Sequence, residues 1–417
     1  MSPSALSAKE RVPFILGIVN GAFYFLASAL IDPNIVIAQF VGHLGPAKEL
    51  AGLAPAILSG GWFLPQLFMA VYAGGLPYKK PIYSLSAYIR VLAMGGVALA
   101  VALSGRLSPS MTLWAFYLFL ALFATGTGIG GVAFMDMVGK TIPKNRLSEF
   151  FSWRLLAGGI LGFGGGFLVR AILADETRFP FPKNYGLIFG LAWICYSIAV
   201  MTYVFVPEPP SPRRDPKSLG ERWKEALSPF WKDPQFRRLI FARWAVYFAA
   251  IAVPYYALFA KESLGAPESM AGVYISTQVL AGALSNLAWG KLGDRLGGRS
   301  VLVGGALLAA SASGCALLLS LAQFQRPYLM AGVFALVGMA INALTVSGLA
   351  FILELAPPAQ REEYVGLHYS LTAPTILAPV LGGQLLRVSS FPVLFGVSTL
   401  LGLLGSVVAW RLPKSRD

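Results

Sequence analysis

Long apolar segments, separated by short polar ones, recur from one end of the chain to the other. Residues 271–289 contain no charged side chain, and neither do residues 300–325. A helix needs ~20 apolar residues to cross ~30 Å of hydrocarbon, and its backbone must find its hydrogen bonds within the chain. The pattern therefore predicts membrane-spanning helices at about 13–40, 49–74, 82–104, 110–137, 151–173, 185–207, 237–260, 267–290, 300–322, 327–354, 364–387 and 391–411.

This pattern predicts an all-α membrane protein with twelve transmembrane helices. We expect one six-helix bundle at 1–207 and a second at 237–417, joined by a cytoplasmic linker at 208–236. In the linker, Ser218 and Glu221 form the capping-box pattern S-x-x-E. Apolar residues then follow at helical spacing and predict an amphipathic helix on the inner membrane surface, with a disordered linker as the alternative: Trp223, Leu227, Phe230 and Trp231.

The distribution of basic residues predicts the orientation. The chain has 417 residues and a net charge of +14, yet only 12% of its residues are charged. With both termini in the cytoplasm, the inner segments carry 22 Lys and Arg and the outer segments 8. Cytoplasmic loops are enriched in Lys and Arg, so we expect an integral protein of the cytoplasmic membrane with both ends inside. The same loops account for the positive charge without a nucleic-acid partner.

The sequence shows no pattern of catalytic or metal-binding residues. Cys195 and Cys315 lie far apart inside apolar segments, which favours packing roles over a disulfide. We find no metal-ligand cluster, no Ser-His-Asp set and no phosphate-binding loop with its lysine, so we expect no cofactor, no metal and no enzymatic activity. The first span is too long for a cleaved signal peptide, and we expect it to be retained.

The two halves resemble each other at a fixed offset of 215 residues. Each half has a basic inner loop after its second helix, "GGLPYKKPIYS" and "GKLGDRLGGRS", and an acid-proline-arginine order after its fourth. A six-span repeat about an axis normal to the membrane is a plan used by transporters, and it predicts pseudo-twofold symmetry here. The pairs at this offset are Gly75 and Gly290, Pro143 and Pro358, and Arg146 and Arg361.

The second of these loops carries a recognisable motif. It reads G-x-L-x-D-R-x-G-x-R-x-x-L and resembles the loop between helices 8 and 9 of the major facilitator superfamily. Gly298 stands where a basic residue is usual, and the loop of the first half lacks the aspartate. The motif residues are Gly290, Leu292, Asp294, Arg295, Gly297, Arg299 and Leu302.

The resemblance implies that this loop is a conformational latch. Asp294 should lie near the N-terminus of helix 11, where a carboxylate is favoured by the helix dipole. Arg295 and Arg299 should face Glu354 at the inner end of helix 10; the alternative is that they are only cytoplasmic anchors. In the first half, Asp136 has three candidate partners, Lys79, Lys80 and Arg90, and the equivalent Arg146 and Arg361 complete the expected latch set.

The resemblance also implies a central cavity lined by helices 1, 4, 7 and 10. Asn20, Tyr24 and Ser28 form one polar stripe on helix 1. Polar groups with aromatics suit a neutral or amphipathic organic solute, whereas hydrogen bonding between helices is the alternative role. The other expected cavity residues are Trp62, Gln66, Arg90, Thr125, Tyr247, Tyr255, Gln278, Asn342 and Thr345.

Three arginines and one small-residue face remain within the spans. Arg90 lies deep enough in helix 3 to need a partner or water, whereas Arg154 and Arg243 are placed to snorkel toward the interface. No acid lies at the centre of any span, and His368 fits a packing role. On helix 5, small residues at steps of four predict a close helix contact: Gly158, Gly162 and Gly166.

Together these observations predict a secondary transporter. We expect it to move a small organic solute across the cytoplasmic membrane by alternating access, as a monomer in contact with membrane lipid. A proton or another ion is a candidate for the coupled species. The alternative is a lipid flippase or scramblase on the same scaffold, with a more apolar cavity that opens sideways to lipid.

Overall fold

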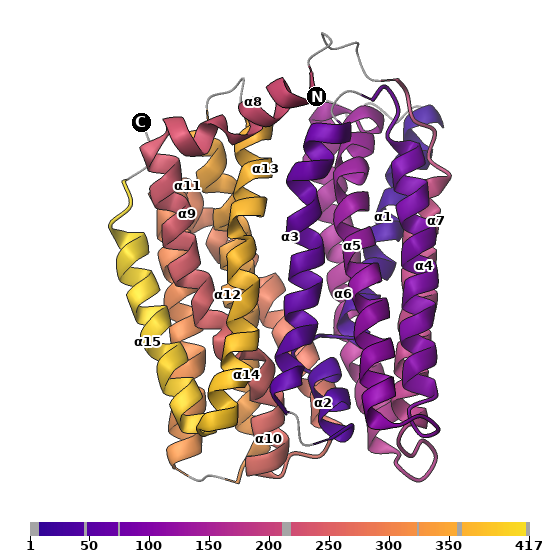
Figure 1. Ribbon diagram of the computed structural model, residues 1–417, viewed down its shortest axis with the longest axis vertical. Coiled ribbons are helices and arrows are strands. Elements are labelled where there is room, and N and C mark those ends of the chain that lie inside the picture. The colour runs from indigo at the N-terminus through magenta and orange to yellow at the C-terminus, as the bar shows by residue number, and fades with distance from the viewer. Residues whose placement is uncertain are drawn as a thin grey trace.

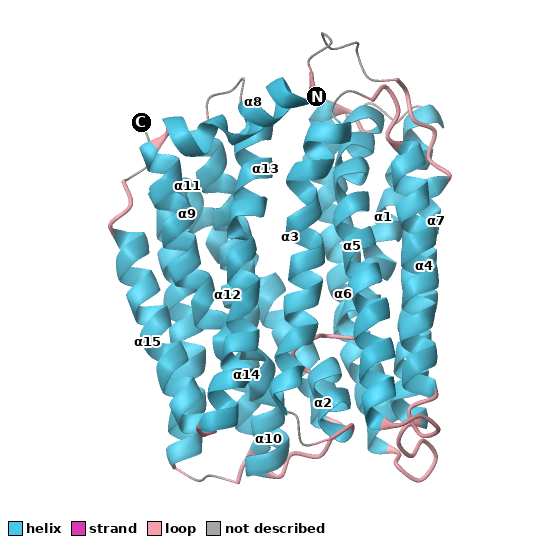
Figure 2. Cartoon of the chain, viewed as in Figure 1, coloured by secondary structure: helices cyan, strands magenta, loops and turns pink. Residues whose placement is uncertain are grey.

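The computed structural model describes residues 8–45, 48–73, 76–210, 218–322, 325–356 and 361–413. Every regular element in these ranges is helical (Figure 2). The α-helices are α1 (Ala8–Leu30), α2 (Val36–His43), α3 (Leu53–Ala73), α4 (Lys80–Ala102), α5 (Pro109–Thr141), α6 (Leu147–Ala174), α7 (Lys183–Val204), α8 (Leu219–Lys232), α9 (Pro234–Tyr247), α10 (Tyr256–Leu264), α11 (Met270–Leu321), α12 (Met330–Leu355), α13 (Arg361–Thr372), α14 (Ala378–Val388) and α15 (Phe391–Trp410).

Short 3₁₀ turns join several of these helices into single crossings. The long seventh crossing consists of α9, a 3₁₀ turn and α10, and the eleventh consists of α13, a 3₁₀ turn and α14. A proline lies inside each of these two turns, Pro254 and Pro374, and its missing N–H interrupts the α-helical ladder. The turns are η1 (Lys48–Gly52), η2 (Lys144–Arg146), η3 (Phe248–Tyr255), η4 (Pro327–Leu329) and η6 (Ala373–Leu377).

The helix α11 accounts for two membrane crossings. It is 52 residues long, and Gly297 within it has φ 78° and ψ 167°, a conformation that glycine adopts without a steric penalty. A Cβ atom added to Gly304 would lie 3.0 Å from the Trp289 ring. In a straight helix these two residues would lie roughly 22 Å apart. The chain therefore reverses at Gly297, and the eleven stretches long and apolar enough to span a membrane include one that folds back on itself.

The helices form two groups that stand side by side (Figure 1). The indigo-to-magenta helices α1 to α7 form one group, and the red-to-yellow helices α9 to α15 form the other. The helix α8 lies across one end of the molecule, and both chain ends lie at that same end. We call this end the inner end, following the orientation that the basic loops predict, and the opposite end the outer end.

The apolar core joins the two groups most extensively toward the outer end. There, one cluster combines buried aromatic residues of the first half, including Phe40 and Tyr185, with those of the second half, including Tyr255 and Phe259. Toward the inner end, the first half has a separate cluster around Phe150. The inner cluster of the second half takes from the first half only side chains of α3. Apolar burial therefore holds the two halves together most firmly at the outer end.

The small-residue face of α6 makes close helix contacts, as its spacing predicts. A Cβ on Gly158 would meet Phe25 of α1, and one on Gly166 would lie 2.6 Å from the carbonyl oxygen of Gly272 in α11. Ser276 of α11 donates a hydrogen bond of 3.0 Å to the carbonyl of Phe163. This face is thus the contact between α6 of the first half and α11 of the second.

The predicted amphipathic helix is present, and part of its apolar face covers protein. α8 starts with the capping box of Ser218 and Glu221. Trp223 and Phe230 pack against the inner cluster of the second half, whereas Trp231 is 73% exposed. Trp223 and Phe230 are thus partly covered by neighbouring helices, whereas Leu227 and Trp231 are exposed, and the location of α8 on the inner membrane surface stays a prediction. Residues 211–217 of the linker lie outside the described residues.

Candidate functional site

The motif loop of the second half lies exposed at the inner end. Asp294 and Arg295 are exposed, and neither forms an ion pair with any residue in the described ranges. Arg299 points to the end of α15, where its guanidinium donates 3.3 Å and 2.9 Å hydrogen bonds to the carbonyls of Trp410 and Leu412. Its expected orientation toward helix 10 is not what the structure shows, because the unsatisfied carbonyls at the end of α15 bind it instead.

Other members of the expected latch set lie apart from this loop. Gly290 is exposed on α11, with no atom near its Cβ position, and Gly297 forms the reversal. Arg146 pairs with Glu149 three residues later, at 2.7 Å. The side chains of Glu354 and Arg361 lie outside the described part of the chain.

The structure brings the first-half basic loop together with Asp136. The Asp136 carboxylate pairs with Lys79 at 2.6 Å and with Lys140 at 2.6 Å. Lys140 also pairs with Glu208 at 2.5 Å, and the side chain of Glu208 is only 1% exposed. The backbone N–H groups of Lys79 and Lys80 donate to the same carboxylate at 2.8–3.0 Å. Glu208 thus caps the N-terminus of α4 and neutralises Lys140.

The role of Glu208 was missed from the sequence, where it appeared only as the start of the linker. The one available signal was an acid placed directly after helix 6, next to an inner loop rich in lysine. All members of this network come from the first half, so it fixes the inner ends of α4, α5 and α7 to each other. It is not itself a contact between the two halves.

An ionic cluster that the sequence did not reveal joins the halves at the outer end. Glu268, between α10 and α11, pairs with Lys261 of α10 at 2.6 Å and with the imidazole of His43 in α2. Tyr185 of α7 donates a hydrogen bond of 3.2 Å to the same carboxylate. His43 stacks on Phe181 with 4.6 Å between ring centroids. We call these residues the outer latch.

The charge of Glu268 is maintained by its partners. Burial alone would raise the pKa of its carboxyl, but the hydrogen bonds and charges of His43 and Lys261 lower that pKa from the ordinary 4.5 to about 2. The ionised carboxylate therefore favours the closed latch at pH values above 4.5. This contribution is lost only as the pH falls from 4.5 toward 2.

Replacing Glu268 by Gln should open the outer end of the molecule. The amide keeps the size of the side chain but removes the charge that holds Lys261 and His43. We expect the closed state to lose on the order of 2 kcal/mol, a shift of about 30-fold in the open-to-closed ratio. In the unmodified protein, acidification from pH 8 to 5 should not titrate Glu268.

Spin labels can measure this opening. Cysteines introduced at the exposed outer positions Arg178 and Ser263 report the distance between the halves, once Cys195 and Cys315 are replaced by Ser. The Glu268→Gln variant should show a longer distance, whereas the exposed outer acid Glu176, changed to Gln, provides a control with the same loss of charge. An unchanged distance distribution in Glu268→Gln would contradict the latch.

Two further hydrogen bonds join the halves near the outer end. Gln278 of α11 donates 3.0 Å to the carboxylate of Asp32, which follows α1. Ser276 donates to Phe163, as described above. Farther toward the inner end, the described residues show only two long hydrogen bonds to α3 of the first half, both of 3.5 Å: from Ser370 to the carbonyl of Phe63 and from Arg222 of α8 to the carbonyl of Val71. The structure is thus closed at the outer end.

Several of the expected cavity residues are bonded between helices of one half. Asn20 donates 2.5 Å to the carbonyl of Ala199, and Ser28 lies 2.9 Å from the hydroxyl of Tyr196, so this stripe of α1 faces α7. The Tyr255 hydroxyl donates 2.8 Å to the carbonyl of Pro379. For these residues, as for Gln278, the structure favours the alternative role of hydrogen bonding between helices.

The remaining expected cavity residues have no hydrogen bond to another helix among the described atoms. Tyr24 makes edge contacts with the rings of Tyr196 and Phe25, at 5.4 Å and 6.0 Å between centroids, and Tyr247 binds Arg243 within its own helix. Thr345 is exposed and donates only to Ile341, one turn earlier. Their role in a substrate cavity stays a prediction, as it does for Trp62, Gln66, Thr125 and Asn342.

The arginines within the spans are placed differently from our expectation. Arg90 of α4 is buried, and its guanidinium binds only Ser86 and faces the Tyr83 ring at 5.4 Å. Arg243 is 1% exposed, so it does not snorkel to water. Arg154 packs against Gly21 of α1 and faces the Phe134 ring at 4.6 Å. None of the three has a carboxylate partner among the described residues.

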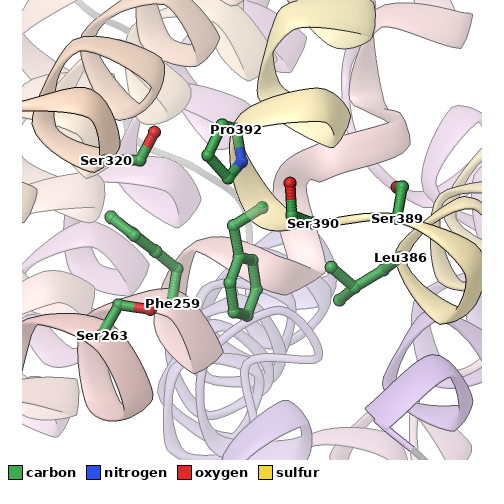
Figure 3. Close-up of a pocket in the computed structure, with 8 residues that line it drawn as sticks. Phe259, Ser263, Ser320, Leu386, Ser389, Ser390 and Pro392 are labelled. Carbon is green, nitrogen blue, oxygen red and sulfur yellow. The ribbon is translucent and has the colours of Figure 1, made fainter.

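A separate cavity of about 390 Å³ lies at the outer end of the second half (Figure 3). It is enclosed by α10, α14, and the ends of α11 and α15. Serine hydroxyls and two phenylalanine rings line it, and none of the expected cavity residues takes part: Ser263, Ser320, Ser389, Ser390, Phe259 and Phe391.

Comparison with known proteins agrees with this architecture. The sequence model of the Major Facilitator Superfamily matches residues 239–417. The MFS-type transporter YuxJ of Bacillus subtilis is 25% identical over 335 residues, which are 77% of this chain and 79% of that protein. The second half of the chain thus matches the Major Facilitator Superfamily, and most of the chain is similar to a transporter of that type.

Solved structures show the same fold over the whole chain. A variant of the nucleoside transporter NupG superposes with a TM-score of 0.74 at 12% identity, covering 96% of this chain and 100% of that one. A bacterial homologue of the iron transporter ferroportin in its inward-facing state gives 0.70 at 16% identity, with 98% and 99% coverage. Its outward-facing state gives 0.63 at 16% identity, with 97% and 99% coverage. These likenesses, at 12–16% identity, show that the chain has the fold of these membrane transporters.

Proposed function

We propose that this protein is a secondary transporter that moves a small organic solute across the cytoplasmic membrane by alternating access. It acts as a monomer, with both termini in the cytoplasm and a proton or another ion as the coupled species. The distribution of contacts between its two halves carries the proposal. The ionic and hydrogen-bonded contacts concentrate at the outer end, while the motif charges Asp294 and Arg295 lie exposed at the inner end.

Alternating access requires one state that is closed at the outer end and open at the inner end. The distribution of contacts fits that state. A rocking motion that breaks the outer latch would separate α6 from α11 at the outer end and bring the inner loops together. The Asp294 carboxylate would then bind a helix N-terminus or a cation. In the present structure, which is closed at the outer end, it has no ion-pair partner among the described residues. The better superposition on an inward-facing relative supports the same assignment.

A second pair of spin labels tests alternating access directly. Asn145 and Arg238 are exposed at the inner ends of the first and second halves. When Glu268→Gln lengthens the outer distance, the distance between labels at Asn145 and Arg238 should shorten in the same fraction of molecules. If both ends open together, the protein behaves as a channel, and the proposed mechanism is wrong.

The Asp294→Asn variant should slow transport without unfolding the protein. The side chain is exposed, so its replacement leaves the packing unchanged, but a carboxylate at a helix N-terminus stabilises the inner-closed state by about 0.3–1 kcal/mol. We expect uptake into proteoliposomes to fall about 2–5-fold, with an unchanged melting temperature. Equal uptake rates at equal protein content, with Glu176→Gln as the control, would exclude a role for Asp294 as a latch.

A further inference from the structure

The membrane interior of this protein holds positive charge that no carboxylate of the described residues neutralises. Arg243 is the most deeply buried of these groups. Its guanidinium donates 2.8 Å to the Tyr247 hydroxyl and 3.0 Å to the carbonyl of Leu344 through one nitrogen. The other two nitrogens, Nε and Nη1, are buried and have no hydrogen-bond partner. Buried cations are normally paired, so these free donors indicate an absent acceptor.

Among the described side chains, none with a carboxylate lies against Arg243. It packs against Gly348 of α12, where a Cβ would lie 2.8 Å from a guanidinium nitrogen, and its charge acts on His368 and Tyr369 of α13. His368 is itself buried, with its Nδ1 atom unpartnered. The site therefore presents a guanidinium and an imidazole, both with unused nitrogen atoms.

The first half contributes a second group of uncompensated cations. Arg154 of α6 has a buried Nη1 without a partner, and Arg90 of α4 binds only Ser86. Tyr24 and Tyr83 both lie within electrostatic reach of these two arginines. The helices α4, α6 and α9 all start at the inner end, so the three guanidinium groups lie at similar depths, roughly 10–15 Å from their helix starts.

Burying these charges in the membrane costs free energy unless a bound ligand neutralises them. A charged side chain near the centre of a membrane span destabilises insertion by roughly 2.5–3.5 kcal/mol, and such residues usually mark a substrate path. Three of them without a carboxylate in the described ranges would repel a cation and attract an anion. The nearby rings of Tyr24, Tyr83, Phe134 and Tyr247 provide apolar surface for the body of such a ligand.

We propose that the transported solute is an organic anion, and that Arg243 binds its carboxylate or phosphate group. The proposal rests on the transport function proposed above and specifies its substrate class. A planar guanidinium with two free donors matches the two oxygens of a carboxylate or phosphate, which a lysine ammonium cannot do to the same extent. Arg90 and Arg154 make the electrostatic potential positive on the first-half side of the route that the solute takes.

A paired ligand panel tests the proposal with purified protein. Each carboxylate or phosphate monoester in the panel is accompanied by its neutral amide or alcohol, and binding is measured as a rise in melting temperature. We expect the anions to stabilise the wild type and their neutral partners not to. In Arg243→Gln, the apparent Kd of the stabilising anions should rise by roughly 30-fold or more, because the buried charge pair is lost.

Two matched variants distinguish binding from folding. Arg243→Lys keeps the charge but not the planar fork, and should retain part of the affinity. Arg106→Gln removes an exposed outer arginine and should change nothing. Without ligand, Arg243→Gln should melt no lower than the wild type, because it removes an uncompensated buried charge.

The other outcomes separate this proposal from the proposed function. If neutral or cationic solutes stabilise and are taken up by both the wild type and Arg243→Gln, the protein is a transporter but not of anions. If anions bind through Arg243 but no solute enters proteoliposomes, the anion site stands and the transport function is wrong. If no anion of the panel stabilises the protein, or if Arg243→Gln binds anions normally, this inference is wrong.

Discussion

The Glu208→Gln variant should lose about 2–3 kcal/mol of stability, because breaking a buried ion pair leaves an unneutralised charge behind. Glu208 accepts two backbone N–H groups at the start of α4 and pairs with Lys140, and only 1% of its side chain is exposed. An amide in its place would turn an N–H donor toward groups that also donate. We reduce the expected loss below that of a fully buried pair because Lys140 keeps Asp136 as a partner.

The measurement is thermal unfolding of the detergent-purified variant, together with the monodisperse fraction on size exclusion. The matched control is Glu149→Gln, which removes the same charge from a pair with Arg146 in which the acid is 42% exposed. An exposed pair contributes well under about 1 kcal/mol, so this control should melt close to the wild type. Equal melting temperatures for the two variants would show that the Glu208 network does not stabilise the first half.

The Gly166→Val variant should separate α6 from α11. A Cβ at this position would lie 2.6 Å from the carbonyl oxygen of Gly272 and 2.9 Å from the backbone nitrogen of Ser276. Both are main-chain atoms, so no side-chain rotation relieves the clash and one helix must move. Overpacking of this kind costs about 1–3 kcal/mol or more, and here the cost falls on the outer-closed state.

We expect spin labels at Arg178 and Ser263 to report a wider outer end in Gly166→Val, with reduced thermal stability. The control is Gly164→Val on the same helix, whose Cβ position has no atom within 4 Å. Both substitutions change helix propensity equally, so their difference isolates the contact with α11. If Gly164→Val and Gly166→Val behave alike, the close approach at Gly166 does not hold the outer end closed.

The sequence predicted the helical crossings with few errors because each crossing is specified by its own residues. About twenty apolar residues, flanked by charge, define a span without reference to any other part of the chain. The turn that contains Gly297 and the capping box at Ser218 and Glu221 are likewise determined by a few neighbouring residues, and the structure confirms both. The glycine spacing on helix 5 also predicted a close contact correctly, although not which helix makes it.

The candidate site was less predictable because polar side chains have several possible partners in a folded bundle. The sequence could not show that Asn20 would bond to Ala199, 179 residues away, rather than face a cavity. Nor could it show that Arg299 would cap α15, or that Glu208 would cap α4. Each of these outcomes depends on which helix ends and faces meet.

Hydropathy, basic loops and the motif around Asp294 were thus sufficient to predict a helical membrane protein, whereas the similarity of its two halves stays a prediction. The tertiary structure alone decided which end is closed, through His43 and Glu268, which are 225 residues apart. It alone showed that Arg243 is buried and has no carboxylate partner in the part of the chain that the structure describes. The physical reason is that insertion into a membrane is a property of each segment, whereas gating and ligand binding depend on contacts between distant segments.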